Sequence, residues 1–548
     1  MTIITTSNLG GTTNLFTLNG LNTSYLVLPG VTLVTQVPVF DVSVFVSGFG
    51  AQASSIDILG TAVSDGPVVF LTHGDSHSVN IGVSGTVATS GSGGSYPIYM
   101  SGAFSSLNNA GTIHAFAGTV GAILIGDGSD VVNTGIITGG AGGVQMEGQV
   151  ISLTNTGTIT GSRGDNAAQY TGVTMNFANF GTIQNSGVIL GNGNSSSVGI
   201  YSTGSGNLSV DNDGLIGSAL GFGIWINQDV RLLLTNTGTI RGDGGSLSLN
   251  GQDDVIVNRG QLVGNVSLAG GSDLLDTVGG TVLGTVFGGA GDDVFRVDGM
   301  GLAIVEFSGG GTDRIESLAS YTLADTPEIE NLTLIGAATN GWGNAGANTL
   351  NGNDQSNRLG GAAGNDTING HGGDDSLRGD AGNDLVNGGE GEDVLRGGAG
   401  VDTLYGGDGD DTIWGDGSTD RLYGDAGEDV LVGGAGRDTL FGGADADTFF
   451  FRAVSDSGAA ASQRDVIADF ETGLDLIDLT RIDANTVLNG NQAFIFIGTA
   501  AFGNVAGQLR AIHGANSFLQ GDVNGDGVAD FAVQMNGIAT VSVNDLLL

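Results

Sequence analysis

Apolar residues alternate with small polar residues along much of the first 340 residues, as in SLTNTGTITG from Ser152 and RLLLTNTGTIRG from Arg231. A period of two predicts short β-strands, because successive side chains of a strand point to opposite faces. These stretches share a tag, Asn-x-Gly followed by two mostly aliphatic or β-branched residues. The tag recurs at intervals of 22 to 24 residues, with one interval of 33 that contains an extra tag, NSGVI, at Asn185. The regular tags begin at Asn109, Asn133, Asn155, Asn179, Asn212, Asn236 and Asn258.

A repeating unit of this length, with three short strands and tight turns, cannot bury its own inward face. Stacking the units as coils of a parallel β-helix buries that face. Asparagine suits a repeated corner, because its amide can bond to the coil above or below. We therefore predict an all-β fold in which residues 1–340 form a parallel β-helix-like region. A β-sandwich is the alternative, but sandwiches do not normally repeat one tag at a fixed interval.

A stricter pattern occupies the chain from Gly361 to Phe450, which divides into ten consecutive nonapeptides such as GGAGVDTLY. Slot one is always glycine and slot six is always aspartate. Slot eight is Ile, Leu, Val or Phe, and we expect its side chain to enter the core. Two weaker units, from Gly343 and Gly352, carry asparagine in slot six. Related stretches occur earlier as IGDGSDVVN, GGAGDDVFR and SGGGTDRIE, so the two patterns grade into each other.

These nonapeptides resemble the G-G-x-G-x-D-x-U-x repeat of RTX (hemolysin-type) calcium-binding proteins. The resemblance implies a parallel β-roll over residues 341–450, in which two nonapeptides form one coil and each calcium ion is shared by loops n and n+2. Slot-six aspartates of neighbouring coils would then lie about 4.8 Å apart and repel by about 3 to 4 kcal/mol at an effective dielectric near 20. Between Gly361 and Phe450 there are 20 acidic side chains and four arginines, a net charge of −16, which eight divalent ions would neutralise.

Calcium takes hard oxygen ligands from carboxylates and backbone carbonyls, so slots one to six supply a suitable set. In the loops that begin at Gly415 and Gly442, slot four is not glycine but Ser418 and Asp445, respectively, so these two loops depart most from the pattern. The predicted ligand residues are the slot-six aspartates Asp366, Asp375, Asp384, Asp393, Asp402, Asp411, Asp420, Asp429, Asp438 and Asp447, the slot-four glycines Gly364, Gly373, Gly382, Gly391, Gly400, Gly409, Gly427 and Gly436, and Asp293 of GGAGDDVFR.

The last hundred residues contain RDVIADF, DLIDL and GDVNGDGVADF, followed by an acidic residue and terminal apolar residues. This order resembles the C-terminal domain of serralysin-type secreted metalloproteases. The resemblance implies that residues 451–548 form a β-rich cap with an uncleaved signal for type I secretion machinery. In GDVNGDGVADF, Asp522, Asn524, Asp526 and Asp530 imitate an EF-hand loop, but slot twelve is Val533. A metal-free β-hairpin turn and a calcium site are both open interpretations of that loop.

The 548-residue chain has a formal net charge of −42, and all of its 15 cationic residues are arginines. Such a surface repels nucleic acid and anionic membranes and attracts cations. The chain contains no cysteine, which excludes disulfides and thiolate metal sites. We expect no membrane span, because no stretch approaches about 18 unbroken apolar residues. The first residues lack the pattern of a cleavable signal peptide.

Enzyme motifs are scarce. The zinc motif H-E-x-x-H of serralysins and the G-x-S-x-G elbow of lipases are absent from the sequence. His73, Asp75 and His77 would share one face of a strand, as a metal or acid/base trio or as a polar turn. Polysaccharide lyases and uronate epimerases also join β-helices to RTX tails, but their chemistry needs clustered cationic groups, and none is evident here.

We therefore expect a secreted calcium-binding protein, extracellular or associated with the cell surface, with a structural or adhesive role. Its expected partners are calcium ions, the type I secretion machinery and either surface glycans or further copies of itself. The alternative is a secreted polysaccharide-modifying enzyme with a β-helix catalytic domain.

Overall fold

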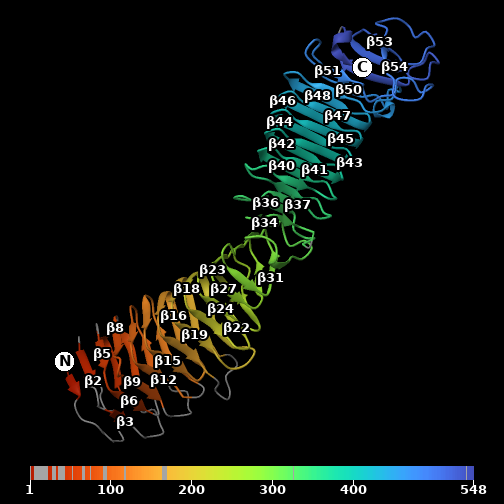
Figure 1. Cartoon of the computed structure of the whole chain (residues 1–548). Coiled ribbons are helices and arrows are strands. Elements are labelled where there is room, and N and C mark those ends of the chain that lie inside the picture. The colour runs from red at the N-terminus through yellow and green to blue at the C-terminus, as the bar shows by residue number, and fades with distance from the viewer. Residues whose placement is uncertain are drawn as a thin grey trace. The chain divides into compact units, whose positions relative to one another are not determined.

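A computed structural model describes residues 2–4, 23–27, 32–34, 44–51, 54–64, 68–74, 76–89, 96–116, 119–162, 170–324, 326–537 and 540–548. The fold is all-β, as predicted, and is built from coils of a parallel β-solenoid (Figure 1). The chain forms two compact units, unit 1 (residues 1–296 and 302–311) and unit 2 (residues 297–301 and 312–548). Within the described parts, no helix is long and apolar enough to cross a membrane. The predicted domain limits at residues 340 and 450 remain predictions.

Unit 1 consists of three-sided coils, and each side is a series of parallel strands. The third series forms a sheet of its own. The first comprises β4 (Val44–Ala51), β7 (Val69–Gly74), β10 (Ile98–Ser101), β13 (Val120–Ile125), β16 (Gly142–Asn155), β18 (Thr171–Asn185), β20 (Val198–Asn212), β22 (Phe222–Ile226), β25 (Gly245–Ser248), β28 (Val266–Gly270), β31 (Thr285–Ala290) and β33 (Ala303–Val305). The second comprises β1 (Thr2–Ile4), β2 (Thr23–Val27), β5 (Ser54–Ile58), β8 (His77–Ile81), β11 (Ser106–Asn109), β14 (Ser129–Asn133), the later parts of β16, β18 and β20, β23 (Asp229–Asn236), β26 (Val255–Asn258), β29 (Leu274–Asp276) and β32 (Val294–Val297). The third comprises β3 (Thr32–Val34), β6 (Thr61–Ser64), β9 (Thr86–Thr89), β12 (Thr112–His114), β15 (Ile136–Gly139), β17 (Thr158–Gly161), β19 (Val188–Gly191), β21 (Leu215–Ser218), β24 (Thr239–Arg241), β27 (Gln261–Val263) and β30 (Thr281–Leu283).

The Asn-x-Gly tags form the corner before the third series. Their asparagines stack in a buried ladder in which each side-chain amide donates from Nδ2 to Oδ1 of the next, at 2.7 to 2.8 Å. The last residue of each tag points inward and stacks in register with its equivalent, as Ile137 does on Ile159. The ladder contains Asn109, Asn133, Asn155, Asn185, Asn212, Asn236 and Asn258, all at most 2% exposed.

The structure corrects one tag. Asn185 of NSGVI stands in the ladder, bonded to Asn155 and Asn212, whereas Asn179 lies exposed within the long strand β18. The coil that contains β18 is longer than the coil before it, because nine residues separate β17 from β18 whereas two separate β15 from β16. The tag at Asn179 matched the pattern by chance, because Phe180 and Thr182 do not occupy the corner that precedes a third-side strand.

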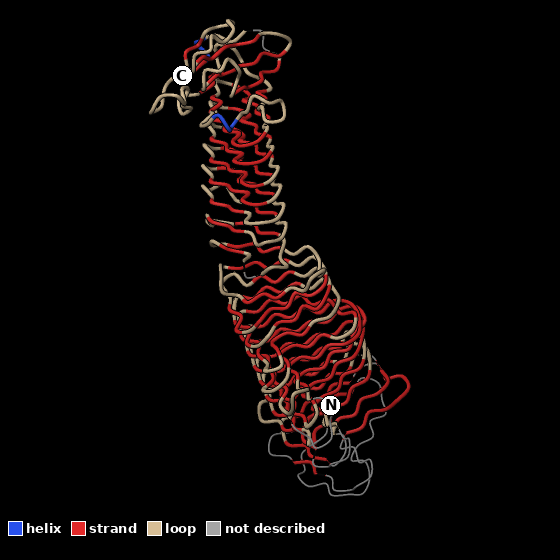
Figure 2. The backbone as a smooth tube through the Cα atoms, turned by 90° about the vertical axis from the view of Figure 1, so that its right-hand side faces the viewer, coloured by secondary structure: helices blue, strands red, loops and turns tan. Residues whose placement is uncertain are grey.

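Unit 2 has coils with only two sides, which Figure 2 shows as regular stacked strands. One side comprises β34 (Arg314–Ser317), β36 (Asn331–Leu334), β38 (Thr349–Asn351), β40 (Thr367–Gly372), β42 (Leu385–Glu390), β44 (Thr403–Asp408), β46 (Arg421–Ala426), β48 (Thr439–Ala444), β50 (Val466–Ile467) and β55 (Phe531–Asn536). The other comprises β35 (Tyr321–Thr322), β37 (Asn340–Trp342), β39 (Arg358–Gly360), β41 (Ser376–Ala381), β43 (Val394–Ala399), β45 (Thr412–Ser418), β47 (Val430–Gly436), β49 (Thr448–Phe450), β51 (Leu476–Asp478) and β56 (Leu546–Leu547).

The nonapeptides alternate between these two sides, so that each residue pairs with the residue 18 positions later, as Leu395 does with Ile413. The slot-eight side chains fill the space between the sides, and all are at most 1% exposed from Leu350 to Phe449. Each buried aliphatic side chain contributes about 1.5 to 3 kcal/mol. The prediction that slot eight forms the core is confirmed.

The C-terminal segment joins the roll directly. β50 comes from RDVIADF and pairs with β48, while β51 comes from DLIDL and pairs with β49. Beyond them lie β52 (Ile495–Phe496) and the antiparallel strands β53 (Gln508–Ile512), β54 (Asn516–Asp522) and β55. The short 3-10 helices are η1 (Val454–Asp456) and η2 (Val543–Asp545).

The asparagine ladder makes a stability prediction. In Asn155→Leu, the Nδ2 of Asn133 loses its shortest hydrogen bond, at 2.7 Å, and the Oδ1 of Asn185 loses its Nδ2 donor, both in a buried site. We expect the free energy of unfolding to fall by about 2 to 4 kcal/mol. Urea unfolding in saturating calcium, followed by circular dichroism, measures this loss. The matched control is Asn108→Leu on the exposed face, which should cost less than about 1 kcal/mol; equal losses would show that the ladder has no special role.

Candidate metal centre

All ten slot-six aspartates of the roll are buried, with exposures of 0% to 3%. They follow the loop that turns the chain from one side of the coil to the other, and slots seven to nine form the next strand. Because consecutive nonapeptides turn at opposite edges, the aspartates form two columns, one along each edge of unit 2. One column contains Asp366, Asp384, Asp402, Asp420 and Asp438, and the other contains Asp375, Asp393, Asp411, Asp429 and Asp447.

Within a column, each carboxylate is held by the preceding coil. The backbone N–H of Asp366 donates to Oδ1 of Asp384 at 2.8 Å, and the same bond recurs along both columns at 2.7 to 3.0 Å. The columns begin at Asn348 and Asn357, whose N–H groups donate to Asp366 and Asp375. The two weaker units are thus the first coils of the same ladder.

The second oxygen, Oδ2, of each of these ten aspartates is buried and has no hydrogen-bond partner among the described residues. It lies against the slot-one glycine of its own nonapeptide: a Cβ built at Gly361 would overlap Oδ2 of Asp366, and the same overlap recurs in every repeat. Slot one is therefore always glycine because a side chain would occupy the space beside the free oxygen. An unpaired buried carboxylate oxygen costs several kcal/mol, which makes this space a fit for a cation.

Slot four also has a structural reason. Gly391 has φ +136°, and a Cβ there would overlap the carbonyl oxygen of Gly373 in the neighbouring coil. Stacked slot-four carbonyls thus line the same edge as the carboxylates. Ser418 (φ +95°) and Asp445 (φ +74°) keep this left-handed conformation without glycine. Positive φ values are found at all eight predicted slot-four glycines, Gly364, Gly373, Gly382, Gly391, Gly400, Gly409, Gly427 and Gly436.

The electrostatics of the columns favour a bound cation. Burial raises the pKa of Asp411 to about 8, and the neighbouring carboxylates of Asp393 and Asp429 add to the rise. Burial likewise raises the pKa of Asp375 to about 7 and that of Asp402 to about 6. Burial and like charge thus oppose ionisation of these carboxyls, and a divalent ion beside the Oδ2 atoms would reverse this effect.

Several acidic residues of the ladders were not predicted. In unit 2, the N–H of Asp438 donates to Oδ1 of Asp465 at 2.8 Å, and that of Asp447 donates to Asp475 at 3.1 Å. RDVIADF and DLIDL therefore extend the two columns into the C-terminal segment. In both motifs the aspartate stands two positions before a core aliphatic residue, as slot six does before slot eight. The two aspartates could not be found from the nine-residue repeat, because they follow Asp438 and Asp447 by 27 and 28 residues instead of 18.

The predicted residue Asp293 is 1% exposed and belongs to unit 1, outside the two columns of the roll. Its Oδ1 accepts from the N–H of Asp273 at 2.8 Å, and Oδ1 of Asp273 accepts from the N–H of Asp254 at 2.6 Å. Asp254 and Asp273 were missed because slot one of their loops is leucine, Leu249 and Leu268.

The EF-hand-like loop connects β54 and β55 as a hairpin. Asp522 accepts from the N–H groups of Gly525 and Gly527 at 2.6 and 2.8 Å, and Asp530 accepts from Val523 N–H at 2.9 Å. These carboxylates cap the backbone of the turn, which favours the hairpin interpretation. Of the His73, Asp75 and His77 trio, Asp75 and the side chain of His73 lie outside the described residues, and His77 is buried in β8.

Comparison with known families identifies the nonapeptides. Residues 342–377, 360–395, 369–404, 396–431 and 423–457 match the RTX calcium-binding nonapeptide repeat (4 copies). No curated protein sequence matches the chain.

Two solved structures come from the mannuronan C5-epimerase AlgE6 of Azotobacter vinelandii. The R3 subunit is 31% identical over 27% of this chain and 77% of its own, and the R2 subunit is 28% identical over 31% of this chain and 91% of its own. Both have a TM-score of 0.21, which is too low to carry a structural argument.

A charge-matched pair of substitutions tests the columns. Asp411→Asn removes a buried ligand oxygen, whereas Asp410→Asn removes the same charge at an exposed slot five. We expect Asp411→Asn to raise the calcium concentration at the folding midpoint about tenfold and Asp410→Asn to change it by less than about threefold. A calcium titration followed by circular dichroism measures both midpoints. Similar shifts would mean that only overall charge matters.

The raised pKa values also predict a pH dependence. A carboxyl whose pKa is raised in the calcium-free fold stabilises that fold below its unfolded pKa of about 4, and this stability disappears as the pH rises through about 6 to 8. The calcium-free roll should therefore keep more of its β-sheet signal at pH 5 than at pH 8, where its buried carboxyls must ionise. Circular dichroism in a chelator at pH 5, 6, 7 and 8 measures this loss, and a calcium-free signal that does not change with pH would contradict the prediction.

Proposed function

Since residues 342–457 are RTX calcium-binding nonapeptide repeats, we propose that this protein is a secreted scaffold or adhesin that calcium folds outside the cell. The ions would lie along the two edges of the roll, bound by the slot-six aspartates and by carbonyl oxygens of the loops, including slot four. The predicted eight ions correspond to the pairs of slot-six aspartates in the ten regular repeats. Asp465 and Asp475 add one stacked pair to each column.

One observation carries this proposal: ten buried carboxylates each hold an oxygen that no group of the described protein satisfies. Without a cation, the roll must either protonate these groups or leave their charges buried, and both options lower its stability at neutral pH. Metal-binding energy is then folding energy. In a cytosol poor in calcium the roll stays unfolded and fit for export, and extracellular modules bind calcium at about 10⁻⁴ to 10⁻³ M.

We assign the C-terminal segment, residues 451–548, two roles in the proposal. It closes the end of the roll, a role supported by the pairing of β50 with β48 and of β51 with β49. It also carries the type I secretion signal, a role that rests on its resemblance to serralysin-type tails. An end cap is useful in a solenoid, because an open coil would expose unpaired strand edges to other copies.

The scaffold role is supported by the outward face of unit 1. One column of the second side presents mostly small polar side chains, stacked in register from coil to coil. Such a surface suits contact with glycans or with other copies more than it suits catalysis, which needs clustered charged groups. The column consists of Asn80, Asn108, Val132, Thr154, Gln184, Asp211 and Thr235.

Calcium dependence and catalysis can be tested on the full-length protein. We expect calcium to raise the β-sheet signal in circular dichroism cooperatively and a chelator to reverse it. Calcium-loaded protein incubated with alginate or pectate should release no unsaturated uronides, which absorb in the ultraviolet. A roll that folds fully without calcium would contradict the calcium proposal, and uronide release that disappears on substitution of a unit 1 residue would show a lyase instead. Proton exchange into the polymer would detect an epimerase.

A further inference from the structure

The third side of unit 1 is a regular sheet whose outward face carries no acidic side chain among the described residues. Its ten strands from β6 to β30 pair in parallel without a register shift, and Figure 1 shows them in succession along the unit. Each strand directs two residues outward, which form two columns. In the column that contains Thr158, threonine or an aliphatic residue stands in nine of the ten strands, and Gln261 is the exception. In the other column, His114 and Arg241 are the only residues that can carry a charge.

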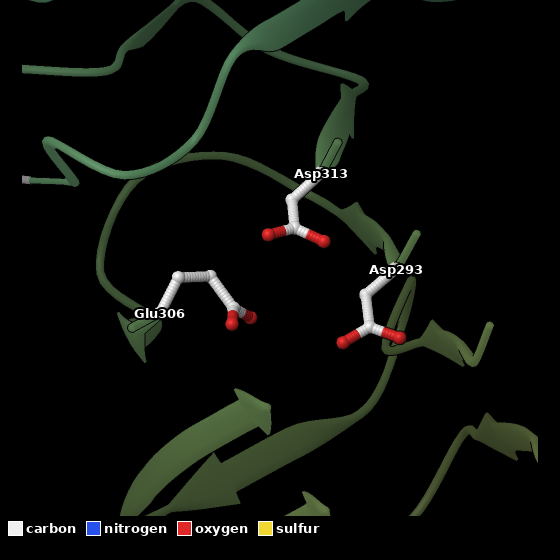
Figure 3. Close-up of side chains that lie close together, drawn as sticks. All are labelled: Asp293, Glu306 and Asp313. Atoms are coloured by element: carbon white, nitrogen blue, oxygen red, sulfur yellow. The ribbon is translucent and has the colours of Figure 1, made fainter. Parts of the chain in front are cut away.

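Acidic side chains of unit 1 lie on its other surfaces. The outward residues of the second side include Asp57 and Asp211. In the last coils, carboxylates lie beside the first side, where the N–H of Gly289 in β31 donates to Oε2 of Glu306 at 2.9 Å. Figure 3 shows the carboxylates of Asp293 and Glu306 pointing toward each other there. Because the whole chain has a formal net charge of −42, a face of ten strands without acid is an exception.

Neither the asparagine ladder nor the core accounts for the composition of this face. The first residue of each tag forms the ladder and the last packs inward, whereas the fourth residue points outward and takes part in neither. β-Branched residues favour strands, but the second side forms strands with Asp211 at an outward position, so strand formation alone does not exclude acid. Ile136 and Leu283 on this face are 47% and 57% exposed. Apolar surface left open to water gains about 25 cal/mol per Å² when it is buried.

We infer that a second copy of this chain packs on the third side of unit 1, sheet face against sheet face. Two copies repel each other through their other surfaces, because each copy is strongly acidic, and they can approach closely only where acid is absent. Stacked sheets pack about 10 Å apart, with the side chains of the two facing surfaces interdigitated. The inference deepens the proposed scaffold role and rests on it, since it names the surface that joins the copies.

The size of the face fits such a contact. Ten strands about 4.8 Å apart, with three to four residues of about 3.3 Å each, cover about 500 Å². Two copies would then bury about 1,000 Å² in total, which is the lower limit for a specific interface. Exposed Asp213 and Asp243, in the turns on either side of the face, would form a polar rim. We therefore expect a reversible dimer with a dissociation constant in about the micromolar range.

Sedimentation velocity of the full-length protein in calcium tests the inference with a matched pair of variants. Thr158→Asp adds a charge near the centre of the face, in β17, whereas Thr182→Asp makes the same change at an outward position of the second side, in β18. We expect Thr158→Asp to raise the dissociation constant of the dimer at least about tenfold and Thr182→Asp to leave it within about twofold of the native value. Circular dichroism in calcium verifies that both variants fold. If Thr158→Asp does not fold, Gln261→Glu, which keeps the shape of the side chain, replaces it.

Salt gives a second, independent measurement on the native chain. Added sodium chloride should lower the dissociation constant, because it screens the repulsion between the two acidic copies. A dissociation constant that rises with salt would show that ion pairs on other surfaces join the copies, and it would overturn the inference.

The remaining outcomes each decide the matter. A native chain that stays monomeric at concentrations about 100-fold above the expected dissociation constant would overturn the inference. Equal weakening by the two aspartate variants would also overturn it, because total charge and not this face would then govern association. A native monomer that sediments with phosphatidylcholine vesicles would assign the face to a lipid surface instead. The proposed function fails separately, since a circular dichroism signal that does not respond to calcium would contradict the calcium proposal even if the dimer forms.

Discussion

Carboxylates that stack at coil spacing in a buried column are the constraint on which unit 2 depends. Each slot-six aspartate uses one oxygen to bind the preceding coil, and that bond aims the other oxygen into a space beside the slot-one glycine. Once these carboxyls ionise, a cation beside the second oxygen would stabilise the coil. The slot-one glycines keep that space open, and the left-handed backbone at slot four turns the loop beside it. The strict nine-residue repeat places these positions in register from coil to coil.

In unit 1 the side chains that stack from coil to coil at the corner are neutral asparagines. An amide offers both donors and an acceptor, so a column of asparagines can bond from coil to coil with no external partner. An ionised carboxylate only accepts hydrogen bonds, so a column of carboxylates needs donors or cations from outside the column. This difference explains why the asparagines of the ladder bond to one another from coil to coil, whereas each slot-six aspartate keeps one oxygen with no hydrogen-bond partner among the described residues. A single coil can use both ladders, since Asn258 and Asp254 lie on the same turn of unit 1.

Much of this organisation could be predicted from the sequence, because the spacing of the repeated residues equals the length of a half-coil or a coil. The nine-residue frame predicted the burial of slot eight and placed the slot-six aspartates together, and the Asn-x-Gly tag predicted three-stranded coils. Where the frame breaks, prediction fails: Asp465 and Asp475 follow insertions. The choice between Asn179 and Asn185 depended on which one faced the core, and spacing alone carries no such information.

The most direct test of the account is a crystal structure grown in calcium, with anomalous difference density recorded for the metal. We predict peaks along both edges of unit 2, each lying between the Oδ2 atoms of aspartates 18 residues apart, such as Asp393 and Asp411. A folded roll with no anomalous density at these positions would contradict the central claim, because the buried carboxylates would then have to be stabilised by something other than calcium.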